Sequence, residues 1–313
     1  MTVVSLKQLR SIAAIHRHGK IVTAAAQLGL TPPAVTLQVQ QLEQETGLLL
    51  FDRTQDGMRP TAAGLVVLDA ALAIEERLRV LADELDAIKG VRRGSLRLGV
   101  VSTAKYFAPR LMAAFMSRYP DIEMKLMVGN RAKTIESIGS HAIDIALMGR
   151  PPPSIPVRAV PFGDHPLIII AAPDHPLVKA RGIARERVAG EAFLVREHGS
   201  GTRISLEIFM REVAGWADKP SIEMDSNETI KQSVMAGLGI AFLSAHTVAA
   251  ELDSGRLVAL DVVGLPIRRQ WYAVTRSDRT MTPVMAAFHD FLSESGAEHL
   301  PTSGATAKPA AGA

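Results

Sequence analysis

The pattern of apolar and polar positions divides this chain of 313 residues into three zones and a tail. Residues 1–60 combine short helical stretches with a strand–turn–strand pattern, and residues 61–90 form one continuous helical pattern. Residues 91–295 alternate apolar strand-like runs with helical patterns. Residues 296–313 are small, proline-containing and almost uncharged, which is typical of a disordered tail. The pattern therefore predicts a mainly α-helical head, a long linker helix and an α/β domain.

The most specific local pattern is a helix–turn–helix at about residues 22–41. An alanine-rich helical stretch ends at Gly29, because glycine readily takes the left-handed conformation that terminates a helix. Thr31 can cap a second helix, with Pro32 at its first position, where the missing N–H costs nothing. The apolar side chains of this helix fall on one face, and the opposite face carries Pro33, Thr36, Leu37 and Gln40. Such a second helix enters the major groove of DNA, and an ordinary helical hairpin is the alternative interpretation.

The residues that follow predict a wing. Residues 48–64 read as a strand, a glycine-containing turn, a second strand and a new helix capped by Thr61. Arg53 and Arg59 flank the tip of this wing, where they can reach phosphates or the minor groove. Residues 1–60 contain six basic and four acidic side chains, a net charge of +2. Non-specific DNA affinity is therefore expected to depend on a few well-placed contacts.

The helix predicted over residues 61–89 contains no proline and ends at Gly90. Alternate spacings of four and three residues, typical of a coiled-coil seam, separate Val67, Ala71, Ile74, Leu78, Leu81, Leu85 and Ile88. A surface helix packed on its own domain is the alternative. We favour a dimerisation helix, because a two-fold dimer presents two recognition helices to a palindromic DNA site.

The zone of residues 91–295 shows strand–helix–strand–helix–strand alternation, which implies a parallel sheet covered by helices on both faces. Two crossing segments, near residues 161–165 and 263–268, are expected to form a hinge between two lobes. Lobe I is predicted to comprise 91–162 and 267–295, and lobe II 163–266. The expected strands are 95–101, 122–128, 143–148, 167–172, 193–196, 221–224, 240–243 and 271–275. The expected helices are 104–118, 133–140, 202–213, 228–237, about 246–252 and 283–292.

Ligands of such sheets bind at the carboxyl ends of the strands, where helix N-termini point. Small hydroxyl side chains, glycines and basic side chains gather at these positions and favour an anionic ligand. A plain helix N-cap is the alternative for each serine or threonine taken singly. The candidate effector-binding residues are Ser102, Thr103, Lys105, Asn130, Arg131, Met148, Gly149, Arg150, Ser200, Gly201, Thr202, Arg203, Asn227, Glu228 and Thr229.

Composition narrows the function classes. The chain has no cysteine, which excludes disulfides, zinc–thiolate sites and cysteine nucleophiles and fits a cytoplasmic protein. It has neither a signal-peptide pattern nor an apolar run of the ~20 residues that a membrane helix needs. Phosphate-loop, dinucleotide, zinc-protease and serine-hydrolase motifs are absent, and the nine histidines show no metal-ligand spacing. We therefore expect no enzyme activity, no catalytic residue, no metal and no membrane partner.

The run AAAQLGLTPPAVTLQVQQLEQETGLLLFDRT…RPTAAG resembles the DNA-binding domain of LysR-type transcriptional regulators over about sixty residues. Pro32 stands where that family often has glutamine, and Leu37 where it often has arginine. Leu37 cannot donate to guanine but can contact a thymine methyl group. The resemblance implies a type 2 periplasmic-binding-protein-like effector domain, with the ligand between the lobes, and a dimerising linker helix. The expected DNA-binding residues are Thr23, Thr31, Pro32, Pro33, Thr36, Leu37, Gln40, Arg53 and Arg59.

Within that family, the segments TPPAVTLQ, VSTAKYFAPRL, NRAKTIESI, MGRPP, REHGSGTR and SNETIKQSVMAGLGIAFL are similar to regulators of Calvin-cycle (RuBisCO) operons. The resemblance implies an activator of carbon dioxide fixation genes that uses no cofactor and responds to a co-inducer such as a phosphorylated metabolite or NADPH. The expected partners are double-stranded DNA with a palindromic operator, RNA polymerase, a small anionic metabolite, and further copies of the chain in a homodimer or homotetramer. A LysR-type regulator of another metabolic operon and a solute-binding protein are the alternatives.

Overall fold

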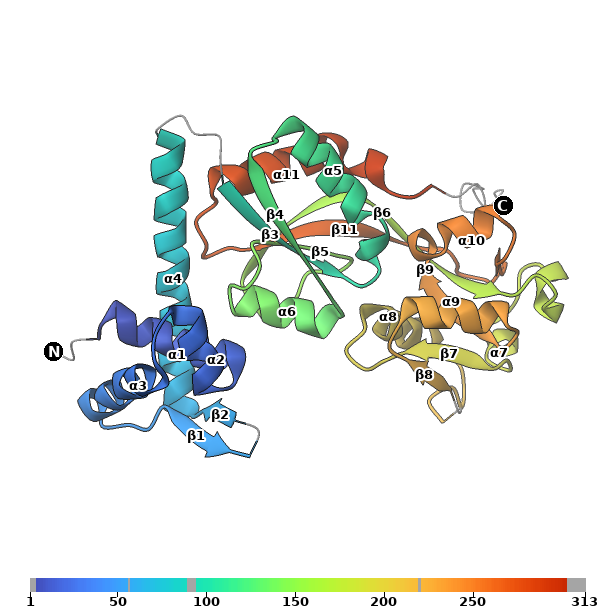
Figure 1. Ribbon diagram of the computed structural model, residues 1–313. Helices are drawn as coiled ribbons and strands as arrows, with labels where there is room; N and C mark the ends of the chain where they lie inside the picture. The colour runs from blue at the N-terminus through green and yellow to red at the C-terminus, as the bar shows by residue number, and fades with distance from the viewer. Residues whose placement is uncertain (1–3, 56, 89–93, 219–220, 303–313) are drawn as a thin grey trace. The chain divides into compact units, whose positions relative to one another are not determined.

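The computed structural model describes residues 4–55, 57–88, 94–218 and 221–302. The chain divides into two compact units, Met1–Lys89 and Gly90–Ala313, and each is described by itself (Figure 1). None of the helices in the described ranges has the length and apolar character needed to cross a membrane.

The first unit contains the predicted helix–turn–helix, wing and long helix. Its elements are α1 (Leu6–His18), α2 (Ile21–Leu28), α3 (Pro32–Thr46), the antiparallel strands β1 (Phe51–Thr54) and β2 (Gly57–Pro60), and α4 (Ala62–Ile88). Gly29 ends α2 at a φ of 64°, and Pro32 begins α3. Thr31 occupies the N-cap position of α3, but its side chain makes no capping hydrogen bond. Thr61 does cap α4, because its Oγ1 accepts from the Gly64 N–H at 3.0 Å.

The helices of the head enclose one small core, to which α3 contributes its predicted inner face: Val35, Val39 and Leu42 are buried. The wing is attached to the end of α1 at Gly57. A Cβ at this position would stand 2.2 Å from the carbonyl oxygen of Gly19, so only glycine permits the close approach. The next residue, Met58, donates its N–H to the same oxygen at 2.8 Å. The sheet and the helices therefore form one unit.

Among the described residues, the N-terminal half of helix α4 contacts the head, where Arg17 of α1 also pairs with Glu75 at 2.9 Å. Leu68 and Ala71 are buried in the head, and α4 packs mainly against α1. Further along, the exposed fractions of the seam residues lie between 36% and 47% at Ile74, Leu78, Leu81 and Leu85. These four residues form the apolar stripe of α4. The last predicted seam residue, Ile88, has a side chain outside the described part of the structure.

The second unit is built on one nine-stranded sheet of order β4-β3-β5-β11-β6-β9-β7-β8, with β10 paired to β6. The strands are β3 (Gly94–Val101), β4 (Ile122–Gly129), β5 (Ile145–Met148), β6 (Val157–Ala171), β7 (Phe193–Arg196), β8 (Ile222–Met224), β9 (Ile240–Ser244), β10 (Val258–Ala259) and β11 (Ile267–Arg276). The sheet is mixed, whereas a parallel sheet was predicted. β3 pairs in parallel with β4 and β5, and β7 with β8 and β9, but β6 and β11 are antiparallel to each other and to their other neighbours.

The mixed character arises because β6 and β11 carry the chain between the lobes in opposite directions (Figure 1). Residues 161–165, predicted as a crossing segment, lie inside β6, and residues 267–268 lie inside β11. The two strands pair from Val157 to Leu167, with an irregularity between Trp271 and Tyr272. The connection between the lobes is therefore a pair of hydrogen-bonded strands.

Helices cover both faces of the sheet in each lobe. They are α5 (Ala108–Arg118), α6 (Arg131–Gly139), α7 (Arg185–Val188), α8 (Gly201–Met210), α9 (Asn227–Met235), α10 (Ala249–Asp253) and α11 (Pro283–Ser295). Short 3₁₀ turns span Ala104–Tyr106, Pro176–Lys179, Ala245–Thr247 and Gly296–His299. The helix predicted over residues 104–118 is interrupted at Phe107, since Pro109 fits only in the first turn of α5. In lobe I, α5 and α11 lie on one face of the sheet and α6 on the other (Figure 1).

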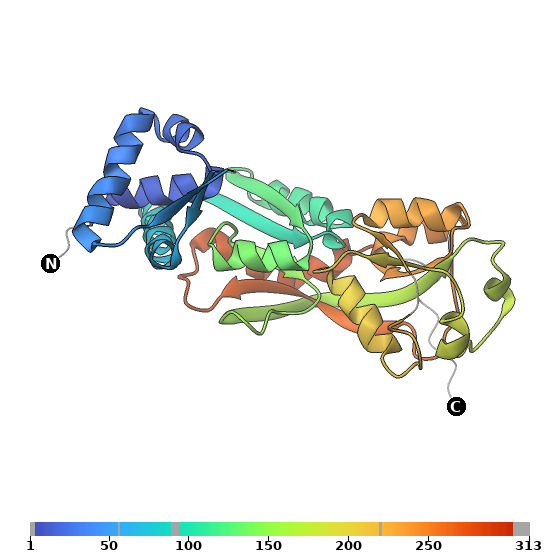
Figure 2. The ribbon, with the colours of Figure 1, turned by 90° about the horizontal axis from the view of Figure 1, so that it is seen from below.

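Lobe II shows the period-two burial expected of a strand covered on both faces. Along β6, Leu167 and Ile169 belong to the core under α8, whereas Ile168 and Ile170 belong to the core under α9. The same alternation holds along β7 and β9. Figure 2 shows α8 and α9 on opposite sides of these strands.

The prediction that a disordered tail begins at residue 296 is wrong. Residues 296–299 form a 3₁₀ turn, and Leu300 is buried in the core of lobe I. A Cβ at Gly163 would stand 2.4 Å from Leu300 Cδ1, so β6 makes room for this side chain. Small and mostly uncharged residues surround Leu300 in the sequence, so the pattern did not indicate that this one apolar side chain is buried. The remainder of the predicted tail, residues 303–313, lies outside the described residues.

Candidate functional site

A cavity of about 240 Å³ lies between the two lobes of the second unit. The loops that follow β3 and β5, the start of α6, the N-terminus of α8 and the crossing strands β6 and β11 surround it. Its lining residues are Val101, Ser102, Thr103, Arg131, Met148, Gly149, Arg150, Pro153, His165, Leu167, Ser200, Gly201, Thr202, Ile204, Ser205 and Arg269. Strand ends and a helix N-terminus meet here, as the sequence predicted.

Nine of the predicted effector-binding residues line this cavity: Ser102, Thr103, Arg131, Met148, Gly149, Arg150, Ser200, Gly201 and Thr202. The sequence reasoning missed His165 and Arg269, which face each other across the paired strands β6 and β11. It also missed Ser205, one turn into α8. A signal for the two strand residues was present, because each is a polar residue within or beside a segment predicted to cross between the lobes.

The other six predicted residues do not line the cavity: Lys105, Asn130, Arg203, Asn227, Glu228 and Thr229. Arg203 faces away from it, where its guanidinium pairs with Glu207 at 3.0 Å and with Glu223. The Thr229 N–H is close to the capping hydroxyl of Ser226 at the start of α9. The Lys105 ammonium lies 5.1 Å from the ring centre of Tyr106. Consecutive side chains of a helix point in directions about 100° apart. Thr202 therefore faces the cavity, whereas Arg203, the next residue, does not.

Three arginines give the cavity a strong positive charge. Arg131 at the start of α6, Arg150 after β5 and Arg269 on β11 all line it, and no acidic side chain is among the lining residues. Burial and the neighbouring charges of Arg150 and Arg269 lower the pKa of Arg131. Burial and Arg150 likewise lower the pKa of Arg269. These cations repel each other in a partly desolvated space, which a bound anion would relieve.

Neutral donors complete this anion-binding arrangement. The hydroxyl of Ser200, the N-cap of α8, makes no capping hydrogen bond, and the first turn of α8 borders the cavity. Helix N–H groups and the helix dipole both favour an anion at such an end. Ser205 Oγ accepts from Arg269 Nη1 at 2.6 Å and donates to the Gly201 carbonyl at 2.7 Å. This bridge holds the Arg269 guanidinium beside the start of α8.

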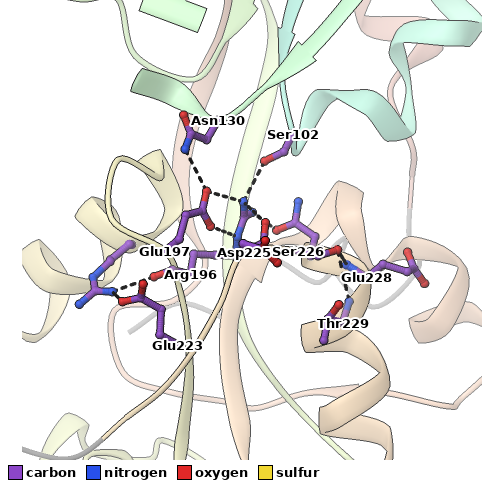
Figure 3. Close-up of polar contacts among 11 residues, drawn as sticks. Ser102, Asn130, Arg196, Glu197, Glu223, Asp225, Ser226, Glu228 and Thr229 are labelled. Carbon is purple, nitrogen blue, oxygen red and sulfur yellow. Dashed lines mark hydrogen bonds and ion pairs between the residues drawn. The ribbon is translucent and has the colours of Figure 1, made fainter. Parts of the chain in front are cut away.

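A set of polar contacts beside the cavity joins the lobes (Figure 3). Its centre is Arg196 at the end of β7, which is only 2% exposed and pairs with Glu197 at 2.7 Å. Arg196 Nη2 also donates to Ser102 Oγ of lobe I at 3.2 Å, and Asn130 Nδ2 of lobe I donates to Glu197 Oε1 at 3.2 Å. Asn227 accepts from Arg196 through its Oδ1. These contacts explain the positions of Asn130 and Asn227 outside the cavity.

Two further contacts between the lobes lie close by. The Tyr106 hydroxyl donates to Glu228 Oε2 at 3.2 Å, and the Ala132 N–H donates to the Gly199 carbonyl at 3.2 Å. Burial and the Glu228 charge raise the pKa of Tyr106, so its hydroxyl stays protonated and can donate. The four pairs Ser102–Arg196, Asn130–Glu197, Tyr106–Glu228 and Ala132–Gly199 form what we term the interlobe latch. Ser102 belongs both to the latch and to the cavity wall.

The predicted DNA-binding residues form a separate surface on the first unit. All are exposed except Thr36, which is half-buried. Leu37 is 54% exposed on α3. The Thr36 hydroxyl donates to the Pro32 carbonyl at 3.0 Å, so toward DNA it can only accept. Thr23 Oγ1 similarly donates to the Lys20 carbonyl at 2.9 Å. Helix α3 therefore presents a mostly neutral surface, and the exposed Arg53 and Arg59 of the wing supply positive charge.

Comparisons with known proteins agree with this two-part arrangement. Residues 6–65 match the family model "Bacterial regulatory helix-turn-helix protein, lysR family", and residues 89–297 match "LysR substrate binding domain". The chain is 58% identical over 298 residues to the HTH-type transcriptional regulator CbbR of Sinorhizobium medicae (strain WSM419), which covers 95% of each chain. It is 46% identical over 297 residues to the RuBisCO operon transcriptional regulator of Allochromatium vinosum, which covers 95% of this chain and 98% of that one.

A solved structure extends the likeness to the second unit. The regulatory domain of Synechocystis PCC6803 CcmR in complex with 2-PG aligns with a TM-score of 0.60 and 36% sequence identity, over 64% of this chain and 97% of that one. The expectation of a regulator rather than an enzyme is confirmed by the family to which both matched regions belong. The chain belongs to the LysR family of transcriptional regulators.

Proposed function

We propose that this regulator acts in the cytoplasm, where it controls carbon-fixation genes of the RuBisCO operon type in response to a small anionic metabolite. The three arginines that converge with the N-terminus of α8 on a cavity without acidic side chains carry the proposal. The name of one relative, the RuBisCO operon transcriptional regulator of Allochromatium vinosum, supports the target. A regulator of another metabolic operon is the alternative, and footprinting of the protein on the DNA upstream of its own gene would distinguish the two.

The size of the cavity narrows the effector class. A volume of about 240 Å³ suits a small phosphorylated acid. The dinucleotide NADPH would need a site larger than this, because sites for drug-sized ligands span about 300–1,000 Å³. The related CcmR domain is described as a complex with 2-PG, a compound of the favoured size and charge. The effector would act as a co-inducer and not as a cofactor.

Calorimetric titration with 2-PG, phosphoenolpyruvate and NADPH tests this assignment. We expect the two small phosphorylated acids to bind and NADPH to bind more weakly or not at all. A protein that binds none of these anions but binds a neutral aromatic compound would contradict an anion sensor.

The interlobe latch provides a route from effector to DNA. A ligand shifts a conformational equilibrium only if it binds one arrangement better. Ser102 Oγ accepts from Arg196 across the lobes, and its own O–H remains able to donate to a ligand oxygen. An effector at Ser102 would therefore favour the arrangement with the latch formed. In a dimer, the resulting change in lobe angle would alter the positions of the DNA-binding heads and their contact with RNA polymerase.

Replacing Tyr106 with phenylalanine tests the latch without changing the cavity wall. The variant loses the hydrogen bond from the Tyr106 hydroxyl to the half-exposed carboxylate of Glu228, which stabilises the latch by roughly 1 kcal/mol. If the effector binds more tightly to the arrangement with the latch formed, the apparent dissociation constant of this variant for 2-PG rises by about fivefold. Tyr119→Phe is the matched control, because Tyr119 packs on Phe115 within lobe I. Equal affinities of the two variants in calorimetric titration would count against the latch.

The apolar stripe of α4 is the proposed dimer seam, and a tetramer would assemble from two such dimers. Leu78 is 36% exposed in the isolated chain, although it is a large apolar side chain at the centre of the stripe. Leu78→Lys is expected to place a charge in the seam and to convert dimers into monomers in analytical ultracentrifugation, with a loss of operator affinity. The control Ala73→Lys changes an exposed residue on a different face of α4. Unchanged sedimentation of Leu78→Lys would show that the seam lies elsewhere.

A further inference from the structure

Lobe II contains a buried ion pair that lies outside the cavity. Lys231 in α9 is 4% exposed and Glu251 in α10 is 6% exposed, and Lys231 Nζ lies 3.0 Å from Glu251 Oε1. Lys231 Nζ also lies 3.0 Å from Oε2 of Glu228, one turn earlier in α9. Burying charges is costly even when they are paired, and apolar residues of similar volume often give equal or greater stability. Stability alone therefore does not account for a lysine at this position.

The same ammonium group faces an aromatic ring of lobe I. Lys231 Nζ lies 4.9 Å from the ring centre of Tyr106, which belongs to the 3₁₀ turn after β3. A cation within about 6 Å of the centre of an aromatic ring is attracted to its face, and the attraction is stronger where water is excluded. The Tyr106 hydroxyl donates to Glu228 Oε2, the oxygen that Lys231 also contacts. Lobe II therefore holds Tyr106 at two points, its ring and its hydroxyl.

Lys231 also prepares Glu228 to accept that hydroxyl. Burial alone would raise the pKa of Glu228, but the hydrogen bond and charge of Lys231, together with the Tyr106 hydroxyl, lower it. The carboxylate stays ionised, and a hydrogen bond to an ionised acceptor is stronger than one between neutral groups. A second ammonium group, that of Lys105, lies 5.1 Å from the same ring centre. Lys105 adjoins Tyr106 in lobe I, so only the Lys231 contact depends on the arrangement of the lobes.

The turn that carries Tyr106 adjoins the cavity wall. Ser102 and Thr103 line the cavity, and Tyr106 follows three residues after Thr103. An effector that contacts these two hydroxyls therefore engages the segment whose tyrosine is held by lobe II. The contact between Lys231 and the Tyr106 ring is thus placed to respond to occupation of the cavity.

We propose that Lys231 is a positioning residue for effector binding, whose buried ammonium group binds the ring of Tyr106 across the lobes and stabilises the arrangement with the latch formed. The inference rests on the proposed effector-sensing function and adds a contact between a cation and a ring to the interlobe latch. The ring of Tyr106 then contributes to effector affinity in addition to its hydroxyl. When the lobes separate, Tyr106 leaves Lys231 and uncovers its ammonium group.

A double-mutant cycle separates this role from a purely structural one. Tyr106→Phe keeps the ring and Tyr106→Leu removes it, so Tyr106→Leu should weaken 2-PG binding at least about threefold more than Tyr106→Phe in calorimetric titrations of the full chain. The cycle is completed in a background with Lys231→Met and Glu251→Leu, which replaces the ion pair by apolar side chains. There the two Tyr106 variants should differ by less than about twofold. An equal difference in both backgrounds would show that the ring acts by apolar packing alone and would overturn the inference.

The background itself gives a second readout. Its thermal midpoint should stay near or above that of the unmodified protein, because apolar replacement of a buried ion pair is often neutral or stabilising. Its affinity for 2-PG should nevertheless fall at least about threefold. A lower midpoint with full 2-PG affinity would identify the pair as purely structural and contradict the proposed role of Lys231.

Chemical labelling of the unmodified protein does not depend on the folding of a variant. Reductive methylation followed by mass spectrometry measures how fast each lysine reacts. Saturating 2-PG should slow the methylation of Lys231 at least about threefold and leave the exposed Lys179 unchanged. Equal reactivity of Lys231 with and without bound 2-PG would overturn the inference and leave the anion-sensing function intact. Failure of the unmodified protein to bind 2-PG would overturn the proposed function and this inference with it.

Discussion

Replacing Arg269 with glutamine is expected to weaken 2-PG binding by about 10- to 100-fold, the largest effect among the substitutions of the cavity wall. A hydrogen bond between charged groups contributes about 1.5–3 kcal/mol, and 1.4 kcal/mol corresponds to a tenfold change in affinity. Ser205 Oγ holds the Arg269 guanidinium at 2.6 Å, so the charge is already positioned for the ligand. Calorimetric titration measures the loss directly.

The same substitution should leave the unliganded protein as stable as before, or more stable. Burial and Arg150 lower the pKa of Arg269, which means that the folded environment disfavours its charged form. Removing the charge relieves that cost, so the thermal midpoint should not fall. Loss of affinity without loss of stability is the signature of a ligand-binding arginine.

The matched control for Arg269 is its neighbour on the same strand. Arg268 is 56% exposed, does not line the cavity, and lies 4.0 Å from Asp164. Arg268→Gln makes the same chemical change on the other face of β11 and should leave the affinity for 2-PG within about twofold. Equal losses in the two variants would indicate a general effect of net charge, and the cavity would not be the anion site.

The second large effect concerns DNA. Gln40→Ala is expected to weaken binding to the footprinted operator by about 5- to 100-fold, because a bidentate side-chain contact to a base contributes about 1–3 kcal/mol. Gln40 is exposed on the face of α3 that carries Leu37, a residue without hydrogen-bonding groups. Sequence recognition by α3 therefore depends strongly on the few polar side chains of that face. Fluorescence anisotropy with operator DNA and with scrambled DNA measures the change.

The adjacent Gln41 supplies the control. It is exposed and chemically identical, but it lies about 100° further round α3. Gln41→Ala should bind operator almost normally, and neither substitution should change affinity for scrambled DNA, where phosphate contacts dominate. A uniform loss on both DNAs in Gln40→Ala would indicate a backbone contact and contradict base recognition.

The sequence was most informative where local rules decide the structure. Gly29 and Pro32 mark the turn before α3 through their own backbone preferences, and the turn forms where they predict. The period of apolar residues placed Val35 and Val39 inside the head. The residues at the ends of β3 and β5 were identified as part of a site because the ends of parallel strands meet at one edge of a sheet.

The tertiary structure alone decided which polar side chains reach the cavity. Arg203 and Thr202 are adjacent in sequence, yet only Thr202 lines the cavity, because Glu207 and Glu223 hold Arg203 on the other side of α8. His165 was missed because its position was interpreted as part of a segment that crosses between the lobes, and Arg269 lies just after the second such segment. They meet only through the antiparallel pairing of β6 with β11, a contact between distant segments that no local pattern encodes.

The sequence by itself thus determined the helix–turn–helix, the long helix with its apolar stripe, and the edge of the α/β unit at which a ligand would bind. These features follow from backbone preferences and side-chain periodicity within short windows. Only the tertiary structure decided that three arginines and an unpartnered histidine share one cavity, and that Asn130 and Asn227 belong to the latch beside it. The physical reason is that charge and hydrogen bonding at this site depend on the packing of two lobes across long-range strand pairs.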